Sequence, residues 1–264
     1  MNILEQIVAD KYKEVALKKS MIPVEVYSKM PLFEVDRRSL KAALMAADST
    51  GIIAEFKRKS PSKGIINGHA DVAQVTTAYS QYAAGISVLT DEPYFGGSND
   101  DLMLARETVS TPLLRKDFII DEYQLYEARS IGADVILLIA ACLSKQQVKQ
   151  LAQAAKSLQL QVLLEVHNEE ELEHICDEVD MIGVNNRNLK TFEVNINTSL
   201  KLINKMPGDK PAVAESGISD ADTIATLRHA GFRGFLIGEN FMKHTNPAIA
   251  FADFINKLQA KIVT

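Results

Sequence analysis

Glutamate and lysine residues stand at or just after the ends of several short apolar runs in this chain, and these residue types suit acid–base chemistry. Glu55 and Lys57 mark one such run, Lys116 another, and Glu165 and Glu215 two more. Crowded ammonium groups lower one another's pKa values and neighbouring carboxylates raise them, so a mixed cluster yields acids and bases suited to neutral pH. If the fold brings these side chains together, they predict a site for general acid–base catalysis.

Eight short apolar segments alternate with amphipathic stretches from residue 49 onward. The predicted strands span residues 51–56, 86–90, 113–117, 135–140, 161–166, 181–185, 212–215 and 234–237. The predicted helices span residues 73–84, 122–131, 145–158, 169–179, 199–206 and 220–230. Strands that alternate with helices imply parallel pairing with right-handed crossovers. Eight such units predict an α/β fold, the closed (β/α)8 TIM barrel, and the lack of a GxGxxG after the first strand disfavours a dinucleotide-binding sheet.

The first 48 residues predict a helical extension. Ile3, Leu4 and Ile7 begin an apolar pattern with helical spacing that includes Tyr12, and a second helical stretch covers residues 39–47. We therefore expect residues 1–48 to lie on a barrel formed by residues 49–264, the whole chain being a single domain.

Alternation along each strand decides which polar side chains meet. Side chains two residues apart share a face, so Ile53, Glu55 and Lys57 should point into the barrel, and Asn185 and Arg187 should point inward together after the sixth strand. Active sites of this fold lie at the C-terminal ends of the strands. A buried lone charge is costly, so these groups must offset one another or a ligand. A structural ion-pair network is the alternative, and the number of charged strand ends favours catalysis.

A second motif predicts a phosphate site. Ser216 and Gly217 follow the seventh strand, and Gly238 and Glu239 follow the eighth, before a predicted short helix at residues 239–243. In this fold the loops after strands 7 and 8 commonly bind phosphate, because glycine lets the backbone approach and N–H groups bind the anion.

Composition limits the other possibilities. The 264 residues carry a formal net charge of −5, and the local basic patch of Lys57, Arg58, Lys59 and Lys63 is the size of a small-molecule site, so we expect no nucleic-acid partner. No apolar run has the length of a membrane span, and the N-terminus lacks a signal peptide, which predicts a soluble cytoplasmic protein. The two cysteines form no CxxC, and the five histidines, expected at surface or cap positions, lack metal-ligand spacing.

Several of these segments together resemble one known family. They are IAEFKRKSPS at 53–62, SVLTD at 87–91, FGGS at 95–98, LLRKDF at 113–118, LEVH at 164–167, IGVNNRNL at 182–189, AESGI at 214–218 and FLIGE at 235–239. In content and order they resemble the motifs of the indole-3-glycerol-phosphate synthases, and the resemblance covers essentially the whole chain. Glu239 stands where some members carry serine. After Thr264 we expect no second, fused barrel of the kind found in some organisms.

The resemblance implies an activity and roles for the residues. The expected reaction is ring closure, decarboxylation and dehydration of 1-(2-carboxyphenylamino)-1-deoxyribulose 5-phosphate to indole-3-glycerol phosphate, in tryptophan biosynthesis, without a cofactor. By motif, Lys116 would be a general acid and Glu165 its acid/base partner. Lys57 would be a second acid or an anchor for the substrate carboxylate, and Glu55 would position and deprotonate. Which lysine acts in which step stays open.

The resemblance also implies binding roles. Asn185, Glu215, Ser60 and Arg187 would hold polar groups of the substrate. The expected slot for the anthranilate ring consists of Phe95, Phe118, Pro61 and Leu189. The expected phosphate contacts are Ser216, Gly217, Gly238 and the backbone of Glu239. We expect the chain to act as a monomer or weak dimer with a small phosphorylated substrate as its partner.

Two other functions compete with this one. A phosphoribosylanthranilate isomerase would need a Cys/Asp acid–base pair and a shorter chain, and neither Cys142 nor Cys176 sits at a strand end facing an aspartate. A non-catalytic barrel that binds a phosphorylated metabolite would lack at least one of the acid–base residues, and all of them are present.

Overall fold

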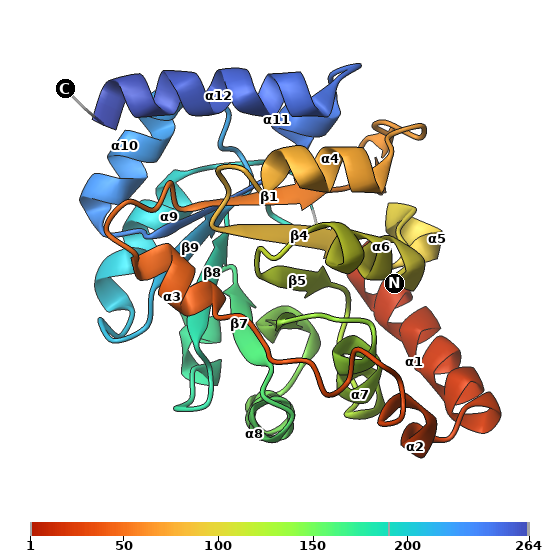
Figure 1. Ribbon diagram of the computed structural model, residues 1–264. Coiled ribbons are helices and arrows are strands. Elements are labelled where there is room, and N and C mark those ends of the chain that lie inside the picture. The colour runs from red at the N-terminus through yellow and green to blue at the C-terminus, as the bar shows by residue number, and fades with distance from the viewer. Residues whose placement is uncertain (1, 190, 263–264) are drawn as a thin grey trace.

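Eight parallel strands close into a barrel in the computed structural model, which describes residues 2–189 and 191–262 (Figure 1). Around the barrel the hydrogen-bonded order is β1, β10, β9, β8, β7, β6, β5, β4 and back to β1. The strands are β1 (Ile52–Phe56), β4 (Gly85–Leu89), β5 (Leu113–Lys116), β6 (Val135–Ile139), β7 (Gln161–Val166), β8 (Met181–Asn185), β9 (Ala212–Glu215) and β10 (Gly234–Ile237). All eight predicted strands are present, with ends displaced by one residue at most, and the predicted TIM barrel is confirmed.

Helices cover the outside of the barrel, and most of the predicted ones are present. The longer helices are α4 (Val72–Tyr79), α6 (Asn99–Thr108), α7 (Tyr123–Ser130), α8 (Lys145–Ser157), α10 (Ala221–Ala230) and α12 (Pro247–Ile262). The predicted helix at 199–206 is divided into α9 (Asn197–Leu202) and η3 (Ile203–Lys205). The short elements are β2 (Lys59–Ser60), β3 (Gly64–Ile65), α5 (Glu92–Phe95), η1 (Ala140–Cys142), η2 (Glu170–His174) and α11 (Glu239–Met242).

The helix predicted at 169–179 is wrong, because only the 3-10 helix η2 forms there. In an α-helix Glu169 and Glu173 would lie four residues apart, where like charges repel. The Glu171 carboxylate instead accepts hydrogen bonds from the backbone N–H of His167 and from the Asn168 amide, which holds the segment in a turn. The apolar spacing there was typical of a helix, but local electrostatics and side-chain bonding prevail.

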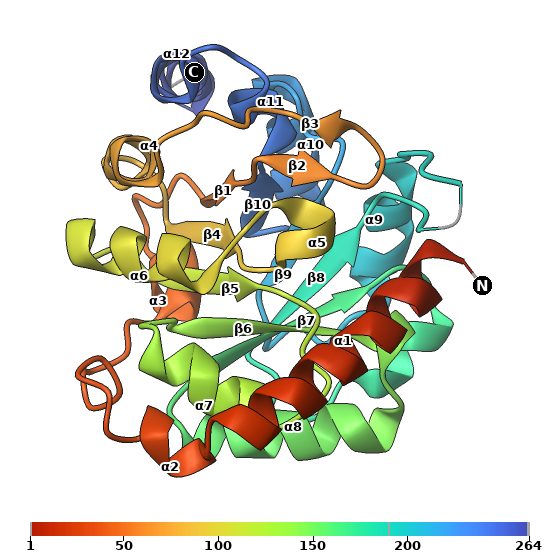
Figure 2. The ribbon, with the colours of Figure 1, turned by 90° about the vertical axis from the view of Figure 1, so that its right-hand side faces the viewer.

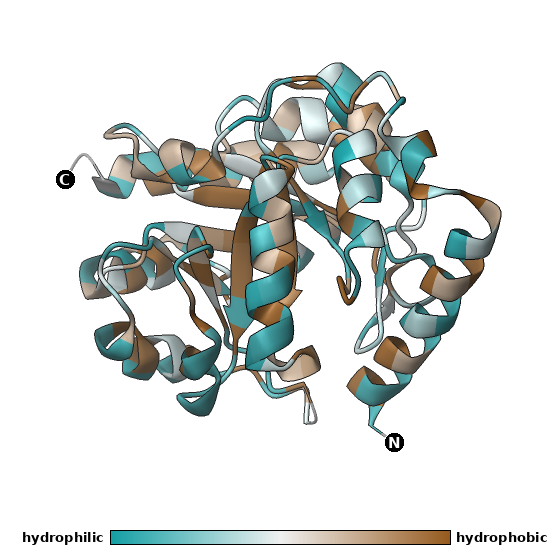
Figure 3. Cartoon of the chain, turned by 90° about the horizontal axis from the view of Figure 1, so that it is seen from below, coloured by the Kyte–Doolittle hydropathy of each residue, from teal (hydrophilic) through white to brown (hydrophobic). Residues whose placement is uncertain are grey.

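The barrel has an inner and an outer apolar layer, as the alternation of side chains predicts. Ile53, Leu114 and Leu163 belong to the inner cluster, whereas Ile52 and Phe56 pack in the outer cluster beneath the helices. In Figure 3 the strands are coloured hydrophobic where helices enclose them, and the outward surfaces of the helices are largely hydrophilic. Glu55 and Lys116 therefore extend the inner face at the C-terminal ends of their strands.

The N-terminal extension forms α1 (Ile3–Met21), α2 (Val24–Tyr27) and α3 (Leu40–Met45). Leu40 and Leu44 of α3 join the inner cluster and close the barrel at the N-terminal ends of the strands. They pack so closely that a Cβ at Gly85 would lie 2.5 Å from Leu40 Cδ1. At the other end α1 runs across the mouth of the barrel, as Figure 2 shows.

A buried lysine ties α1 to the barrel. Lys11 is 2% exposed, and its Nζ lies 3.0 Å from both Asp91 Oδ2, just after β4, and Asp117 Oδ1, just after β5. Burial lowers the pKa of Lys11, but the two aspartates outweigh it and raise the pKa above its ordinary value. The helical apolar pattern of the sequence includes Tyr12, yet Tyr12 is 49% exposed and Lys11 is buried. Asp117 directly follows Lys116, so α1 is anchored next to that lysine.

Within the described ranges 2–189 and 191–262, no helix is both long and apolar enough to cross a membrane.

Candidate active site

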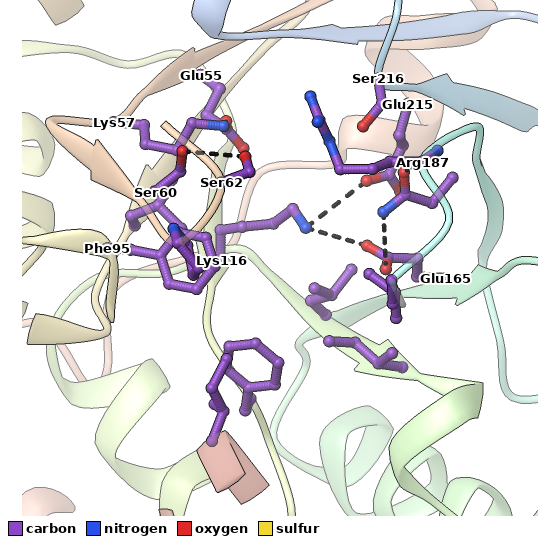
Figure 4. Close-up of a pocket in the computed structure, with 18 of the residues that line it drawn as sticks. Glu55, Lys57, Ser60, Ser62, Phe95, Lys116, Glu165, Arg187, Glu215 and Ser216 are labelled. Carbon is purple, nitrogen blue, oxygen red and sulfur yellow. Dashed lines mark hydrogen bonds and ion pairs between the residues drawn. The ribbon is translucent and has the colours of Figure 1, made fainter. Parts of the chain in front are cut away.

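A cavity of about 160 Å³ opens at the C-terminal ends of the strands and collects the predicted site residues (Figure 4). Among the residues that line it are Glu55, Lys57, Ser60, Pro61, Phe95, Lys116, Phe118, Glu165, Asn185, Arg187, Leu189, Glu215, Ser216 and Glu239. Gly217 and Gly238 line an adjoining cavity of about 440 Å³, which shares Glu55, Lys57 and Arg187 with the first. Residues far apart in the chain thus meet in one place.

Lys116 lies between two glutamates at the centre of this cavity. Its Nζ is 3.0 Å from Glu165 Oε2 and 3.6 Å from Glu215 Oε2. Asn185 at the end of β8 donates a hydrogen bond of 3.1 Å from Nδ2 to the other oxygen of Glu165, Oε1. These groups converge because each is the last or next-to-last residue of its strand, and all of those strands end at the same rim.

The two glutamates beside Lys116 titrate in opposite directions. Burial disfavours the charge of Glu165, but Lys116 outweighs it and holds the Glu165 pKa well below its ordinary value. Burial and the nearby charge of Glu165 raise the pKa of Glu215 to about 8. The Lys116 pKa is raised, because Glu165 and Glu215 outweigh the effect of burial. At neutral pH the site therefore holds an ammonium, a carboxylate and a neutral carboxylic acid.

Glycine residues make room for the buried carboxyl groups. A Cβ at Gly183 on β8 would lie 2.2 Å from Glu215 Oε1, and a Cβ at Gly238 would lie 2.5 Å from Glu55 Oε1. Glu55 is 3% exposed, and its Oε1 lies 2.5 Å from Lys57 Nζ. The cavity thus holds two lysine–glutamate pairs, one from β5 and β7 and one from β1 and its loop.

We expect the raised pKa of Glu215 to appear in the pH dependence of stability. The folded state keeps a proton on Glu215 that the unfolded chain releases above its ordinary pKa of 4.5. The stabilisation due to Glu215 is therefore complete below about pH 4.5 and is lost as the pH rises towards 8. Relative to Glu215→Gln, the wild-type free energy of unfolding should fall on the order of 1 kcal/mol per pH unit in this window. Urea unfolding of both proteins from pH 5 to 8 measures it, and a constant difference would contradict the assignment.

Aromatic and aliphatic side chains line one side of the cavity. The rings of Phe95 and Phe118 lie 6.0 Å apart between centroids, tilted by 39°. Sequence reasoning missed several apolar lining residues: Ile3, Leu4 and Ile7 of α1, and Leu89, Leu137, Ile139, Phe192 and Leu236. The helical period of α1 was visible in the sequence, but nothing in that pattern indicated that its first turns cover the mouth of the barrel.

The adjoining cavity is bounded by an unusual turn and by basic side chains. Ser216 and Gly217 both have positive φ angles, 65° and 76°, and Asn186 Nδ2 donates a hydrogen bond of 3.2 Å to the Ser216 carbonyl. Glycine adopts this conformation readily, whereas a non-glycine residue such as Ser216 costs free energy there, and such strained residues cluster at functional sites. Lys63 and Lys243 also line this cavity. Sequence reasoning noted Lys63 in the basic patch but missed Lys243.

The Glu239 carboxylate holds two basic side chains at this cavity. It pairs with Lys63 Nζ and with Arg187 Nη2, each at 3.6 Å. Two other members of the basic patch point elsewhere, because Arg58 pairs with Asp101 at 2.6 Å and Lys59 donates to the Pro93 carbonyl. The basic patch is therefore divided, and only part of it faces the cavity.

The expectation that all histidines occupy surface or cap positions is wrong for His167. Its side chain is 12% exposed and lies between Glu165 and Glu171. The motif that ends β7 contained this residue, but a histidine two residues after a glutamate gave no indication of such a contact. Among the described residues, no group of three or more His, Cys, Asp or Glu side chains is arranged to hold a metal ion.

The sequence of this chain is similar to those of known proteins over nearly its whole length. Residues 4–254 match the family described as indole-3-glycerol phosphate synthase. A protein of that name from Bacteroides thetaiotaomicron is 48% identical over 259 residues, covering 98% of this chain and 99% of the relative. A second, from Polaromonas naphthalenivorans, is 43% identical, covering 97% of this chain and 99% of the relative.

Solved structures resemble the chain in fold. A mutant tryptophan synthase alpha-subunit from Pyrococcus furiosus has a TM-score of 0.61 at 15% identity, covering 81% of this chain and 99% of that chain. A chain of the tryptophan synthase a2b2 complex from the same organism also has a TM-score of 0.61, at 14% identity and with the same coverage. At such identities the similarity concerns the barrel architecture alone.

Proposed function

This chain belongs to the indole-3-glycerol phosphate synthase family, and from that membership we propose how its own residues carry out the family's reaction. The activity is that of a carboxy-lyase of tryptophan biosynthesis: ring closure with decarboxylation and dehydration of 1-(2-carboxyphenylamino)-1-deoxyribulose 5-phosphate. The observation that carries the assignment of roles is the contact between Lys116 Nζ and Glu165 Oε2 at 3.0 Å inside the cavity.

Ring closure requires an acid at the substrate ketone. As the ring carbon bonds to the carbonyl carbon, the ketone oxygen gains negative charge and takes a proton to become a hydroxyl group. Lys116 is the proposed donor, because it is charged and lines the cavity. Glu165 holds Lys116 in place and keeps it protonated, and Asn185 donates a hydrogen bond to the other oxygen of Glu165.

Decarboxylation and dehydration complete the aromatic system. When the bond to the carboxylate breaks, carbon dioxide leaves and the electron pair returns to the ring, which needs no cofactor. The hydroxyl group then departs as water after a second proton arrives, and a base removes a proton from the neighbouring carbon. Lys57 either anchors the carboxylate or supplies the second proton, and Glu55, 2.5 Å from Lys57 Nζ, serves as the base.

The remaining residues bind and orient the substrate. Phe95, Phe118, Pro61 and Leu189 form the proposed slot for the anthranilate ring. Ser60, Arg187 and Glu215 hold polar groups of the substrate. Ser216, Gly217, Gly238 and the backbone of Glu239 form the proposed phosphate cradle, and Lys63 adds positive charge beside it.

We expect Gly217→Ala to weaken phosphate binding. The residue has a φ of +76°, and an added Cβ would lie 2.4 Å from Val194 Cγ1, so the turn must shift. A left-handed alanine costs about 1–2 kcal/mol, and a displaced cradle should raise KM for the substrate about tenfold or more, with a smaller effect on kcat. Gly208→Ala is the matched control, because a Cβ there meets no atom of the described residues within 4 Å. An unchanged KM in Gly217→Ala would remove Gly217 from the cradle.

The direct test of the function is an assay on the wild-type protein. Incubation with the carboxyphenylamino-deoxyribulose phosphate should produce indole fluorescence, and the chain contains no tryptophan to obscure it. Release of carbon dioxide in equal amount should accompany the signal. If the protein binds the substrate without forming indole, it is a binding protein and the proposed catalytic roles are wrong.

We also propose that the chain acts as one domain, in the cytoplasm, as a monomer or weak dimer without a nucleic-acid partner. Support for one domain comes from Ile3, Leu4 and Ile7 of α1, which line the same cavity as the barrel residues. Sedimentation at micromolar concentration tests the oligomeric state, and a stable larger assembly would contradict this proposal.

A further inference from the structure

The proposed reaction consumes a proton in every turnover, and the inference below rests on that function. Two protons are delivered to the substrate oxygen, first to form the hydroxyl group and then to release it as water. One proton is removed from carbon, and the carboxylate leaves as neutral carbon dioxide. One proton per turnover must therefore come from water. A cavity closed over by α1 and by substrate needs a route for it.

His167 lies behind the catalytic pair and outside the reaction cavity. Its Nε2 is 3.2 Å from Glu165 Oε1, without the alignment of a good hydrogen bond, and within residues 2–189 and 191–262 no other group bonds to this buried nitrogen. Its Nδ1 lies 3.1 Å from Glu171 Oε2. Glu165 in turn contacts Lys116 at 3.0 Å. The series Glu171, His167, Glu165, Lys116 is thus continuous.

This series connects two different cavities. Glu165 and Lys116 line the reaction cavity, whereas His167 and Glu171 line a groove of about 980 Å³ between α1 and the ends of β6, β7 and β8. The His167 and Glu171 side chains are 12% and 15% exposed, so both reach solvent on the groove side. Glu165 is 2% exposed and lies between the reaction cavity and the groove.

We propose that His167 is the residue that relays the consumed proton from the groove to Glu165 and Lys116, with Glu171 holding it for that purpose. After Lys116 has given its proton to the substrate, its amine is neutral. The N–H bond of His167 Nε2 then breaks as the proton passes to Glu165. A rotation of the Glu165 carboxyl group presents that proton to Lys116 Nζ, which takes it up. The neutral imidazole then turns towards the groove and takes a proton from hydronium or from the acid form of a buffer in the solvent, which leaves water or the buffer base behind.

The charges around His167 suit this role. Burial disfavours the imidazolium, but Glu165 from β7 and Glu171 from η2 outweigh it and raise the pKa of His167 to about 10. Lys116, raised above its ordinary 10.5, is the stronger base, so transfer to its neutral amine is favourable. The other ionisable groups on this groove are Cys142 of η1, Glu5 and Tyr12 of α1, and Arg187 and Glu193 after β8.

The test compares the first turnover with later ones in His167→Gln. Lys116 is already protonated when the substrate binds. With Lys57 as the source of the second proton, the first turnover draws no proton through His167 and should run within about threefold of the wild-type rate. Later turnovers in weak buffer should be slower by about tenfold or more, a typical loss for a proton-transfer group, and added imidazole should restore them. Equal slowing of the first and later turnovers would show that His167 only positions Glu165, and an unchanged steady state would also overturn the relay.

A second variant keeps the test independent of how well His167→Gln folds. Glu171→Gln should lower the His167 pKa, seen directly by NMR titration of the imidazole, and should move the alkaline loss of steady-state kcat to lower pH. Glu170→Gln removes a neighbouring exposed carboxylate and is the matched control. If Glu171→Gln leaves both titrations unchanged, the relay is wrong. Wild-type protein that forms no indole would instead refute the proposed function.

Discussion

Lys116→Ala is expected to lower kcat by two orders of magnitude or more, because a positioned general acid contributes about 10²–10⁴-fold to a rate. The structure places no other ammonium group within 4 Å of Glu165 among the described residues. Alanine leaves Glu165 and Glu215 facing each other across a gap with no cation between them. Water entering the gap is a far weaker acid than an ammonium group, so ring closure should become rate-limiting.

Binding of a phosphate ligand should survive this change, because the residues proposed to form the phosphate cradle line the adjoining cavity. Steady-state kinetics by indole fluorescence, together with calorimetric titration of a phosphorylated product analogue, measures both quantities. Lys149→Ala, on an exposed face of α8, is the matched control for loss of a lysine. Near-normal turnover in Lys116→Ala would remove Lys116 from the role of acid.

The strands and the inward residues were predictable because both follow from short-range rules. Each strand is a brief apolar run, and a period of two residues decides which side chains face inward. Once eight parallel strands close, the end of every strand meets at one rim. Glu55, Lys116 and Glu165 had to converge there whatever their separation in sequence. The glycine turns after β9 and β10 lie at the same rim, because they also follow the ends of parallel strands.

The parts that sequence reasoning missed depend on tertiary packing. Nothing in the period of α1 shows that Lys11 is buried against Asp91 and Asp117, because that position is favourable only when the three charges meet. The Glu215 pKa likewise depends on Glu165 and burial rather than on its neighbours in sequence. These features arise between elements.

The structure also bears on the isomerase alternative. Cys142 lies in η1 after β6, where burial first, and then Glu165 and Glu171, raise its pKa to about 12. A thiol with that pKa is neither a good acid nor a good base at neutral pH. Its charged neighbours are glutamates rather than an aspartate partner. Cys142 therefore has the wrong environment for the Cys/Asp chemistry of an isomerase.

Glu165→Gln is expected to slow turnover about 100-fold or more and to change its pH dependence. Glu165 is the charge that contributes most to keeping the Lys116 pKa high against burial, so its loss should lower that pKa. Lys116 acts while protonated, which means that activity is present below its pKa and lost above it. The alkaline loss of kcat should therefore move to lower pH. Glu107→Gln, on the exposed side of α6, should leave the profile of the wild type unchanged.

A double variant separates a working pair from two independent residues. If Lys116 and Glu165 act as a unit, Lys116→Ala/Glu165→Gln should be about as slow as the slower single variant, because the second change removes nothing that still functions. Independent residues would instead multiply their losses. Rates are measured by single-turnover indole formation, and folding of all three variants is checked by urea unfolding. Fully multiplicative losses would mean that the 3.0 Å contact between Nζ and Oε2 has no part in the reaction.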